Sequence, residues 1–545
     1  MRRPELLSIR VAPYEQRRRE IEAGPLPRNV GALIDEVCEA APDRLAWNFF
    51  EGGGALTYRE LQSDVNRLAN GLRTIGVGKG THVGVMLPNI PEFPLTWLAL
   101  ARLGAVMVPV NTRYTPREVH YVLDDAEAEF VVVHQEFFPI LESELGRLPR
   151  LKRDRVLVVA GAQPSCRTWD EVKAAGSARP LADVTVECDD LLNIQYTSGT
   201  TGFPKGCLLT QRYWLVIGKV NAQRDGRRFR HILASTPFFY MDPQWQLMMS
   251  FYQHATLHVA YRQSASRFMH WVREHGIEFC LLPNVLLKQA PSPDERNHKL
   301  VKGNVYGFAK SDHAALEERY DLIAREAFGM TEIGSATFMP IEETGMVGSG
   351  SCGLPSPFRE CRVADPQGNA LPDGEIGELI VRGPGILKGY YRKPEATAAA
   401  FHGEWFRTGD LFRRDARGFF TIVGRIKDMI RRAGENISAL EVEAVVCSIG
   451  EVAEAAALSV ADAVRGEEVK IYVVLQPHIP AGALPPERII DHCAANLASF
   501  KVPRYIEFRK ELPKTPSDKV AKHVLRAEKV DLRLGSWDRE KQCWN

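Results

Sequence analysis

The segment THVGVMLPNIPEFPLTWLALARLGAVMVPVN, residues 81–111, constrains the fold of this chain more than any other. Its apolar run over residues 83–87 predicts a buried strand, residues 92–103 have helical periodicity, and residues 105–110 predict a second strand. Strands joined through a helix are expected to be parallel, because a parallel pair needs a long crossover connection. The same alternation runs from residue 29 to about 133 and again to about 382, which predicts an α/β fold with layered sheets and helices.

The chain is too long for one compact core. It has 545 residues, whereas single hydrophobic cores seldom grow past about 300 residues. The pattern changes where a predicted strand ends at Val423, charged residues gather over 425–432, and helical periodicity begins after Ser438. We therefore predict a large N-terminal domain over residues 1–426 and a small α+β C-terminal domain over residues 427–545. The polar tail after Leu534 is expected to be loosely held.

Composition and charge exclude several classes of protein. The formal net charge is +1 and 25% of residues are charged, so neither nucleic acid nor an anionic membrane is the expected partner. No apolar run reaches the roughly 18 residues of a membrane-spanning helix, and the first residues lack the apolar core of a secretory signal. The ten cysteines show no CxxC pair. We expect a cytoplasmic protein, a monomer or homodimer, that acts on small molecules.

The stretch YTSGTTGFPKG, residues 196–206, has the composition of a phosphate-binding loop. Its glycines let backbone N–H groups turn toward an anion, its hydroxyls add donors, and Lys205 adds positive charge. It is expected to lie between a strand at 191–195 and a helix that begins near Gln211. A Walker loop would need glycine where Pro204 stands. Taken alone, the stretch indicates either a phosphate site or a polar surface turn.

The loop resembles the signature loop of the adenylate-forming superfamily, which contains acyl-CoA synthetases, luciferases and peptide-synthetase adenylation domains. Further segments resemble that family's motifs in the same order: EAFGMTE (326–332), GEIGELIVRGPGILKGYY (374–391), WFRTGD (405–410), GRIKDMIRRAGENIS (424–438) and LPKTPSDK (512–519). Within the superfamily the chain is most similar to crotonobetaine/carnitine-CoA ligases, through QAPSPDERNHKL, AGENISALEVE and FKVPRYIEFRKELP as well as the loop.

The resemblance implies a two-step ligase that uses ATP, Mg²⁺ and coenzyme A. A carboxylic acid would attack the α-phosphate of ATP to give an acyl-adenylate and pyrophosphate, and the CoA thiol would then displace AMP. The acid would be a small or medium organic acid, carnitine-like or betaine-like. Two alternatives stay open at this point: an adenylate-forming enzyme that passes the acyl group to a carrier-protein thiol, and a non-catalytic nucleotide-binding protein.

The motifs carry the family's ATP-binding and catalytic roles onto particular residues. Lys519 would bridge the carboxylate and the α-phosphate, Glu332 would bind Mg²⁺, and Asp410 would accept both ribose hydroxyls. Asp518 departs from the family, which usually has glycine before this lysine. The catalytic set implied is Lys519, Glu332, Thr331 and Lys205. The ATP-binding set implied is Thr197, Ser198, Gly199, Thr200, Thr201, Gly202, Lys205, Phe328, Gly329, Thr331, Asp410, Arg425 and Lys519.

The resemblance also implies a hinge, a CoA face and an acyl pocket. Lys427 and Asp428 would form a hinge about which the C-terminal domain rotates between the two half-reactions. Gly434, Glu435 and Asn436 would line the pantetheine path, next to Ala433 where relatives often have glycine. The acyl pocket would contain Tyr240, Met241, Asp242 and Gln244. Asp242 would neutralise a cationic acid or, alternatively, cap the following helix.

Overall fold

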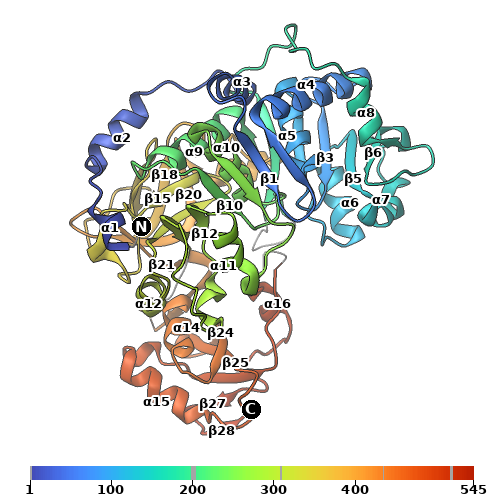
Figure 1. The fold of residues 1–545 in the computed structure, drawn as a ribbon. Coiled ribbons are helices and arrows are strands. Elements are labelled where there is room, and N and C mark those ends of the chain that lie inside the picture. Colours follow the sequence, from blue (N-terminus) through green and yellow to red (C-terminus); the bar gives the residue numbers. More distant parts are fainter. Residues whose placement is uncertain (1–2, 198–203, 307–309, 434, 516–518) are drawn as a thin grey trace. The chain divides into compact units, whose positions relative to one another are not determined.

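The computed structural model describes residues 3–197, 204–306, 310–433, 435–515 and 519–545, which form two compact units (Figure 1). The larger unit consists of Met1–Thr197, Pro204–Cys361 and Val381–Phe406. The smaller contains Arg362–Ile380 and Arg407–Asn545. The prediction of an α/β fold with a large N-terminal part and a small C-terminal part is confirmed. The domain boundary between residues 426 and 427, next to the predicted hinge, stays a prediction.

The first sheet of the larger unit is mostly parallel and is covered on both faces. Residues that alternate along its strands pack against α6 and α7 through one apolar core, and the opposite face carries α4, α5 and α8 (Figure 1). The strand order is β7 (Arg167–Thr168), β6 (Val156–Val159), β5 (Phe130–His134), β3 (His82–Met86), β4 (Val106–Pro109), β8 (Leu191–Thr197) and β9 (Lys205–Thr210). The helices are α4 (Tyr58–Thr74), α5 (Glu92–Leu103), α6 (Pro116–Asp125), α7 (Phe138–Leu145) and α8 (Trp169–Ala175).

The predicted β-α-β unit is confirmed as β3, α5 and β4. The two strands are parallel, with Val83 opposite Met107. Helix α5 ends at Gly104, whose φ of +66° is the left-handed conformation that glycine adopts without steric cost. Periodicity located this unit correctly because every residue that sets its pattern is close in sequence.

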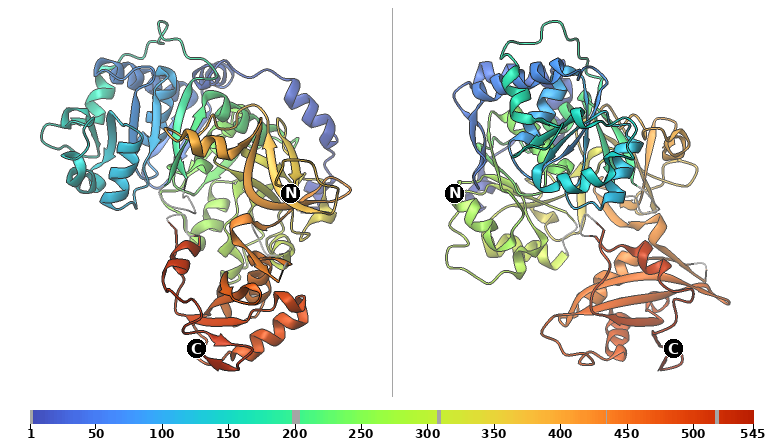
Figure 2. Two further views of the ribbon diagram at one scale, coloured as in Figure 1. Left: turned by 180° about the vertical axis from the view of Figure 1, so that it is seen from behind. Right: turned by 90° about the vertical axis from the view of Figure 1, so that its right-hand side faces the viewer.

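A second sheet of the larger unit has a parallel centre and antiparallel ends. Its strand order in this unit is β16 (Ser351–Pro355), β15 (Gly334–Phe338), β14 (Ala324–Met330), β13 (Lys302–Val305), β12 (Phe279–Leu281), β10 (His231–Ala234), β11 (Thr256–Val259), β1 (Leu45–Phe49) and β2 (Gly54–Thr57). The remaining α-helices of this unit are α1 (Arg3–Ser8), α2 (Tyr14–Ala23), α3 (Val30–Ala40), α9 (Gln211–Gln223), α10 (Met241–Gln253), α11 (Ala265–Glu274), α12 (Lys310–Tyr320) and α13 (Pro394–Ala400). Helices α9 and α10 pack side by side (Figure 1), and Figure 2 shows the same ribbon from two further directions.

Three histidines form a partly buried cluster in the larger unit. His231 Nδ1 lies 3.0 Å from His258 Nε2, and the rings of His258 and His275 stack with centroids 5.1 Å apart. Burial, reinforced by the two neighbouring imidazoles, lowers the pKa of His258 to about 3. The folded protein therefore keeps His258 neutral at pH values where the unfolded chain binds a proton.

This cluster predicts a loss of stability in mild acid. Because the folded-state pKa of His258 is lowered, stability is complete above the unfolded pKa of about 6.5 and falls as the pH drops below it. Between pH 7.5 and 5 the loss from His258 alone is about 2 kcal/mol. Denaturant unfolding at both pH values measures it. His258→Gln should reduce the change in unfolding free energy between the two pH values, whereas His270→Gln, at a largely exposed histidine, should not. The same change in wild type and in His258→Gln would contradict the prediction.

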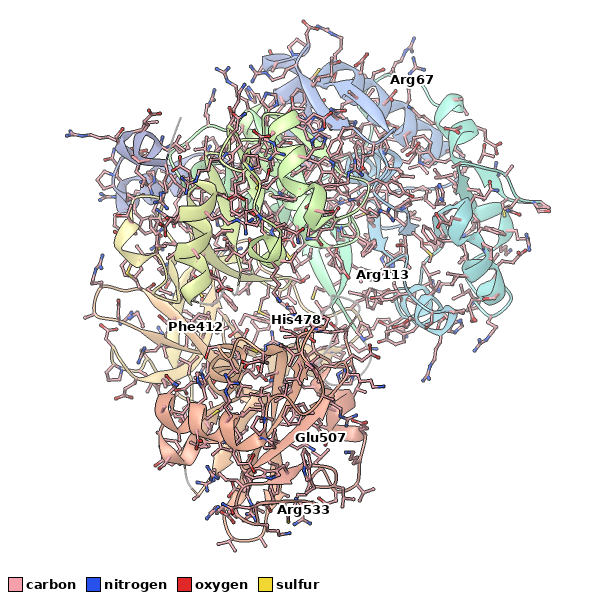
Figure 3. All side chains as sticks on the ribbon, turned by 60° about the horizontal axis from the view of Figure 1, so that its bottom comes forward. Arg67, Arg113, Phe412, His478, Glu507 and Arg533 are labelled. Atoms are coloured by element: carbon pink, nitrogen blue, oxygen red, sulfur yellow. The ribbon has the colours of Figure 1, made fainter. Side chains whose placement is uncertain are left out.

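The smaller unit is built on a sheet with its own apolar core. The strand order is β23 (Glu435–Ser438), β22 (Met429–Arg432), β25 (Gly466–Leu475), β26 (Tyr505–Arg509), β27 (Trp537–Asp538) and β28 (Cys543–Trp544), and β24 (Val452–Asp462) pairs with β25. Its helices are α14 (Ala439–Cys447), α15 (Pro486–Asn496) and α16 (Lys522–Ala527). Lys470 and Glu507, which is labelled in Figure 3, form a buried ion pair across β25 and β26. Five further strands precede this sheet in the chain: β17 (Glu360–Ala364), β18 (Ile376–Arg382), β19 (Phe401–His402), β20 (Trp405–Arg414) and β21 (Phe420–Arg425).

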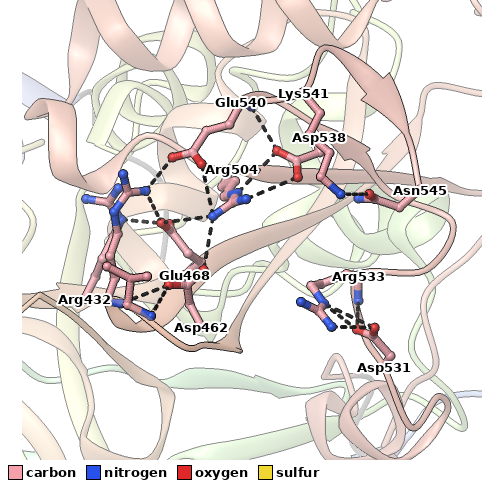
Figure 4. A network of polar contacts seen from close by, with 12 residues as sticks. Arg432, Asp462, Glu468, Arg504, Asp531, Arg533, Asp538, Glu540, Lys541 and Asn545 are labelled. Carbon is pink, nitrogen blue, oxygen red and sulfur yellow. Dashed lines mark hydrogen bonds and ion pairs between the residues drawn. The ribbon is translucent and has the colours of Figure 1, made fainter.

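The expectation of a loosely held tail is wrong. Trp537 and Asp538 are buried in strand β27, and Asp538 accepts hydrogen bonds from Arg504 (Figure 4). Glu540 adds an ion pair to Arg504 at 3.2 Å. Asp538 and Glu540 are thus paired with arginines that are distant in the sequence, Arg504 and Arg465, which composition alone does not reveal.

The described part of the chain contains neither a membrane-spanning helix nor a disulfide. No helix there is both long enough and apolar enough to cross a membrane. All ten cysteines belong to the described residues, and each is a free thiol.

Candidate active site

The predicted phosphate loop connects the two strands of a β-hairpin. Strands β8 and β9 are antiparallel, and Thr197 opposite Lys205 is their pair nearest the loop. The predicted residues Ser198, Gly199, Thr200, Thr201 and Gly202 lie outside the described residues. The sequence predicted a strand, a loop and a helix, but a second strand, β9, lies between the loop and α9. Thr210 caps α9 by accepting a hydrogen bond from the backbone N–H of Tyr213.

Both ends of the loop are attached to helix α6. Tyr196, at the end of β8, donates its hydroxyl to Asp125 at 2.8 Å. Tyr121, one helical turn before Asp125, donates to the carbonyl of Pro204 at 2.9 Å. The described ends of the loop are therefore fixed by side chains from the same face of one helix.

Glu332 and Thr331 lie at the tip of a second hairpin, formed by β14 and β15. The strands approach so closely at Gly329 that an added Cβ would lie 2.5 Å from the carbonyl oxygen of Gly334. Gly334 itself has a φ of +65°, which the tight return of the chain requires. This local geometry explains both glycines and places Phe328 near the end of β14, with Thr331 and Glu332 in the turn that follows it.

Lys205 and Glu332 meet at the same tyrosine, Tyr390. The Tyr390 hydroxyl donates to Glu332 Oε1 at 3.0 Å, and the Lys205 ammonium lies 4.2 Å from the centroid of the Tyr390 ring. Glu332 and Tyr390 are each 6% exposed. The backbone completes the arrangement, because the N–H of Leu387 donates to the carbonyl of Glu332 at 2.7 Å. Tyr390 was absent from the predicted site, although it lies in the family-like segment GILKGYY.

Asp410 and Arg425 form a hydrogen-bonded ion pair within the smaller unit. They are register partners on β20 and β21, and Arg425 Nε donates to Asp410 Oδ1 at 2.8 Å. Within β20, Thr408 Oγ1 accepts from the N–H of Asp410, and Gly409 between them adopts a φ of +72°. Burial raises the pKa of Asp410, while the positive charges of Arg425 and Lys519 act in the opposite direction.

Lys519 is held by two hydrogen bonds to Thr515. The N–H of Thr515 donates to the carbonyl of Lys519 at 2.7 Å, and Thr515 Oγ1 accepts from the N–H of Lys519 at 3.2 Å. Asp518, where the sequence departs from the family, lies outside the described residues. Because the Lys519 charge lowers the pKa of Asp410, these two predicted residues interact electrostatically within one unit.

The predicted hinge is bound to the helix that follows Lys519. Arg526 donates to Asp428 Oδ1 at 2.8 Å and to the carbonyl of Lys427. Lys522 lies 3.8 Å from the second oxygen of Asp428. The hinge segment and α16 are thus joined by opposite charges.

The predicted CoA face has one strained residue. Ala433 has a φ of +51°, a left-handed conformation that costs a non-glycine residue roughly 1 kcal/mol. Its N–H donates to the carbonyl of Arg465 at 2.8 Å, which holds that conformation. Glu435 is exposed at the start of β23, whereas Gly434 and the side chain of Asn436 lie outside the described residues.

The predicted acyl-pocket residues lie around the start of α10. Tyr240 occupies the helix-capping position and its hydroxyl accepts from Asn111 at 3.3 Å. Asp242 lies in the first turn instead of capping the helix and accepts from the Trp245 indole at 3.0 Å. Met241 accepts a long contact from Tyr213, 4.0 Å from its sulfur. Gln244 is fully buried, and its amide bonds to Asn193 and to the carbonyls of Phe238 and Tyr240.

The carboxylate of Glu332 suits a hard divalent cation that is shared with phosphate. Mg²⁺ is commonly held by one or two carboxylates together with phosphate oxygens and water. Within the described ranges, no group of three or more histidine, cysteine, aspartate or glutamate residues is placed to hold a metal ion. The single buried carboxylate of Glu332, which shares Tyr390 with Lys205, is compatible with a metal ion that arrives with ATP.

Comparisons with known proteins agree with this arrangement. The family model described as AMP-binding enzyme matches residues 34–391, and the AMP-binding enzyme C-terminal domain matches residues 441–519. The chain is 31% identical over 512 residues to the crotonobetaine/carnitine-CoA ligase of Proteus mirabilis (strain HI4320), covering 90% of this chain and 98% of that protein. The corresponding ligase of Escherichia coli O45:K1 (strain S88) is 31% identical over 513 residues, covering 91% and 98%.

Solved structures show the same fold. The anthranilate CoA ligase AuaEII in complex with anthranoyl-AMP has a TM-score of 0.83 at 26% identity, covering 93% of this chain and 98% of that one. ATP-bound MatB from Rhodopseudomonas palustris has a TM-score of 0.81 at 25% identity, covering 92% and 99%.

These findings define the class as adenylate-forming acyl-CoA ligases. The chain belongs to the AMP-binding enzyme family, as its motifs indicated. It is an AMP-forming acid–thiol ligase that uses ATP and CoA. The particular roles of its site residues stay predictions.

Proposed function

We propose that this enzyme joins a small or medium organic acid to coenzyme A through an acyl-adenylate. A carboxylate oxygen attacks the α-phosphorus of ATP, the bond to the β-phosphate bridge breaks, and pyrophosphate leaves. The CoA thiolate then attacks the acyl carbon, and AMP leaves with the oxygen that came from the carboxylate. The observation that carries this proposal is the contact of Tyr390 with both Lys205 and Glu332, since it brings the predicted phosphate-binding cation and the predicted metal ligand together in the larger unit.

In the larger unit, we assign the binding of the pyrophosphate leaving group to the phosphate loop and Lys205. The Lys205 ammonium would hold the β- and γ-phosphates, and Thr331 would donate to the α-phosphate. Glu332 would hold Mg²⁺, which supplies positive charge to phosphate oxygens when bound. Phe328, half-buried beside this tip, would lie against adenine.

In the smaller unit, we assign ribose recognition to Asp410 and charge neutralisation to Lys519. The first step brings two anions together, so a cation between carboxylate and α-phosphate lowers the barrier. Arg425 orients the Asp410 carboxylate through its 2.8 Å hydrogen bond. Lys427 and Asp428 would act as the hinge, and residues 434–436 would border the thiol path.

For the acid itself, we propose a carnitine-like or betaine-like molecule with a quaternary ammonium group. Relatives named crotonobetaine/carnitine-CoA ligase support this choice, and so does the partly buried carboxylate of Asp242 next to the aromatic Tyr240. Aromatic rings and a carboxylate together attract a quaternary ammonium group.

Replacing Asp242 with asparagine should reveal the charge of the acid. The KM for γ-butyrobetaine is expected to rise about fivefold, because about 1 kcal/mol of charge attraction is lost. The KM for 5,5-dimethylhexanoate, its neutral carbon analogue, should stay within about twofold. Asp170→Asn changes another first-turn aspartate, on α8, and serves as the control. Equal changes for both acids would contradict a cationic substrate.

Pyrophosphate release with a panel of acids, each with and without CoA, tests the reaction. The proposal predicts acid-dependent pyrophosphate release, AMP as the nucleotide product and an acyl-CoA thioester when CoA is present. Release without any thioester would favour transfer to a carrier protein. Absence of pyrophosphate with every acid would overturn adenylate formation by this chain.

A further inference from the structure

We propose that Tyr390 is a positioning residue that orients Glu332 for a metal ion and holds Lys205 toward the phosphates. This inference rests on the proposed roles of Glu332 and Lys205. It assigns to one side chain the task of holding two opposite charges in separate, defined places.

The hydroxyl of Tyr390 determines the rotation of the Glu332 carboxylate. It donates to Oε1 at 3.0 Å, and a bond to one oxygen fixes the direction in which the other points. Because an ionised carboxylate can only accept, the phenol acts as the donor in this pair. Hydrogen bonds of this kind to a metal-binding group commonly alter metal affinity 10- to 100-fold.

The ring of Tyr390 holds the other charge. Lys205 Nζ lies 4.2 Å from the ring centroid, within the range of a cation–π interaction. The phenol donates its proton toward a carboxylate, which increases the electron density of the ring and its attraction for the ammonium. Without this ring, Lys205 and Glu332 would attract each other directly, and each charge would be partly neutralised before ATP arrives.

The backbone around Tyr390 is fixed from both sides. On one side, the N–H of Tyr391 donates to the carbonyl of Gly206 at 2.8 Å, next to Lys205. On the other, the N–H of Tyr390 donates to Thr397 Oγ1 at 2.9 Å. Gly389, with a φ of +142°, allows this approach, because an added Cβ would lie 2.8 Å from the Thr397 methyl carbon. The phenol thus has a well-defined support.

The next residue provides a matched control. Tyr391 also donates its hydroxyl to a glutamate, the partly exposed Glu127, at 2.6 Å. Glu127 belongs to the turn after α6 and carries ion pairs to Arg150 and Arg392. Tyr391→Phe therefore removes the same kind of hydrogen bond, one residue away, without touching Glu332.

Binding of Mn²⁺, a spectroscopic substitute for Mg²⁺, tests the inference without any catalytic turnover. Electron paramagnetic resonance would measure the Mn²⁺ dissociation constant of the full chain with a non-hydrolysable ATP analogue. For Tyr390→Phe we expect it to rise about tenfold, and for Tyr391→Phe to change less than about twofold. Calorimetry of the analogue in EDTA, without a metal ion, measures the effect of the Tyr390 ring on nucleotide binding through Lys205. Tyr390→Phe, which keeps the ring, should bind the analogue like wild type, and Tyr390→Leu should bind it more weakly. Thermal unfolding of each variant shows whether folding is retained.

Wild-type Mn²⁺ affinity in Tyr390→Phe would overturn the inference. So would an equal weakening in Tyr391→Phe, because that result would show a general structural effect. The proposed metal-binding role of Glu332 is tested by the wild-type protein. If wild type binds no Mn²⁺ with the analogue, Glu332 is not a metal ligand, and the inference that depends on this role is refuted as well. Normal wild-type binding together with an unaffected Tyr390→Phe variant refutes only the role of Tyr390.

Discussion

Replacing Lys519 with alanine is expected to slow adenylate formation about 100- to 1,000-fold. The ammonium of Lys519 would offset the repulsion between carboxylate and α-phosphate, a demand that exists only in the first half-reaction. Thioester formation from a supplied, chemically synthesised acyl-adenylate should therefore keep close to its normal rate. Rapid-quench measurement of pyrophosphate and of acyl-CoA follows the two steps separately.

Lys514→Ala is the matched control for this prediction. Lys514 lies in the same motif, but it is ion-paired with Glu454. We expect both half-reactions to stay within about threefold of wild type in that variant, because the lost ion pair is at the surface. Equal slowing of both steps in Lys519→Ala would show that the assigned division of labour is wrong.

Replacing Lys302 with alanine is expected to lower the free energy of unfolding of the larger unit by about 3 to 5 kcal/mol. Lys302 Nζ lies 2.6 Å from Asp225 Oδ1, and both side chains are 1% exposed. Burial lowers the pKa of Lys302 to about 8, against the opposing influence of Asp225. Removal of the ammonium leaves a buried carboxylate without its partner. Denaturant unfolding, followed by tryptophan fluorescence, measures the change.

Two comparisons separate burial from charge. The double variant Lys302→Met with Asp225→Leu should recover most of the lost stability, because an apolar pair of similar volume needs no compensation of charge. Arg73→Ala removes one partner of an exposed pair with Asp183 and should cost less than about 1 kcal/mol. A Lys302→Ala variant as stable as Arg73→Ala would contradict the prediction.

Local patterns were sufficient to predict much of the fold. The β3–α5–β4 unit and the start of α14 after its capping residue Ser438 were predicted because their signals lie within a few residues of each other. Strand β9 was missed because its hydroxyl and glycine neighbours obscured a short strand. The attachment of residues 362–380 to the smaller unit was also not predictable, since it depends on pairing across the chain.

The candidate site was predictable only in part, for a similar reason. Each motif identifies its own residues, and the resemblance supplied their roles, but no motif shows which residues lie together. The contact of Tyr390 with Lys205 and Glu332 joins positions far apart in sequence. A tyrosine next to glycine and a second tyrosine reads as an ordinary core residue until its neighbours are known. The interaction of Lys519 with Asp410 is hidden from sequence in the same way.

Transfer of ¹⁸O from the acid to the nucleotide tests the acyl-adenylate most directly. The acid that supports turnover would be labelled in both carboxylate oxygens, and AMP, pyrophosphate and thioester would be analysed by mass spectrometry. Adenylate formation predicts one ¹⁸O atom in AMP, one in the thioester carbonyl and none in pyrophosphate. Label in inorganic phosphate with ADP as product, or AMP without label, would contradict the proposed mechanism.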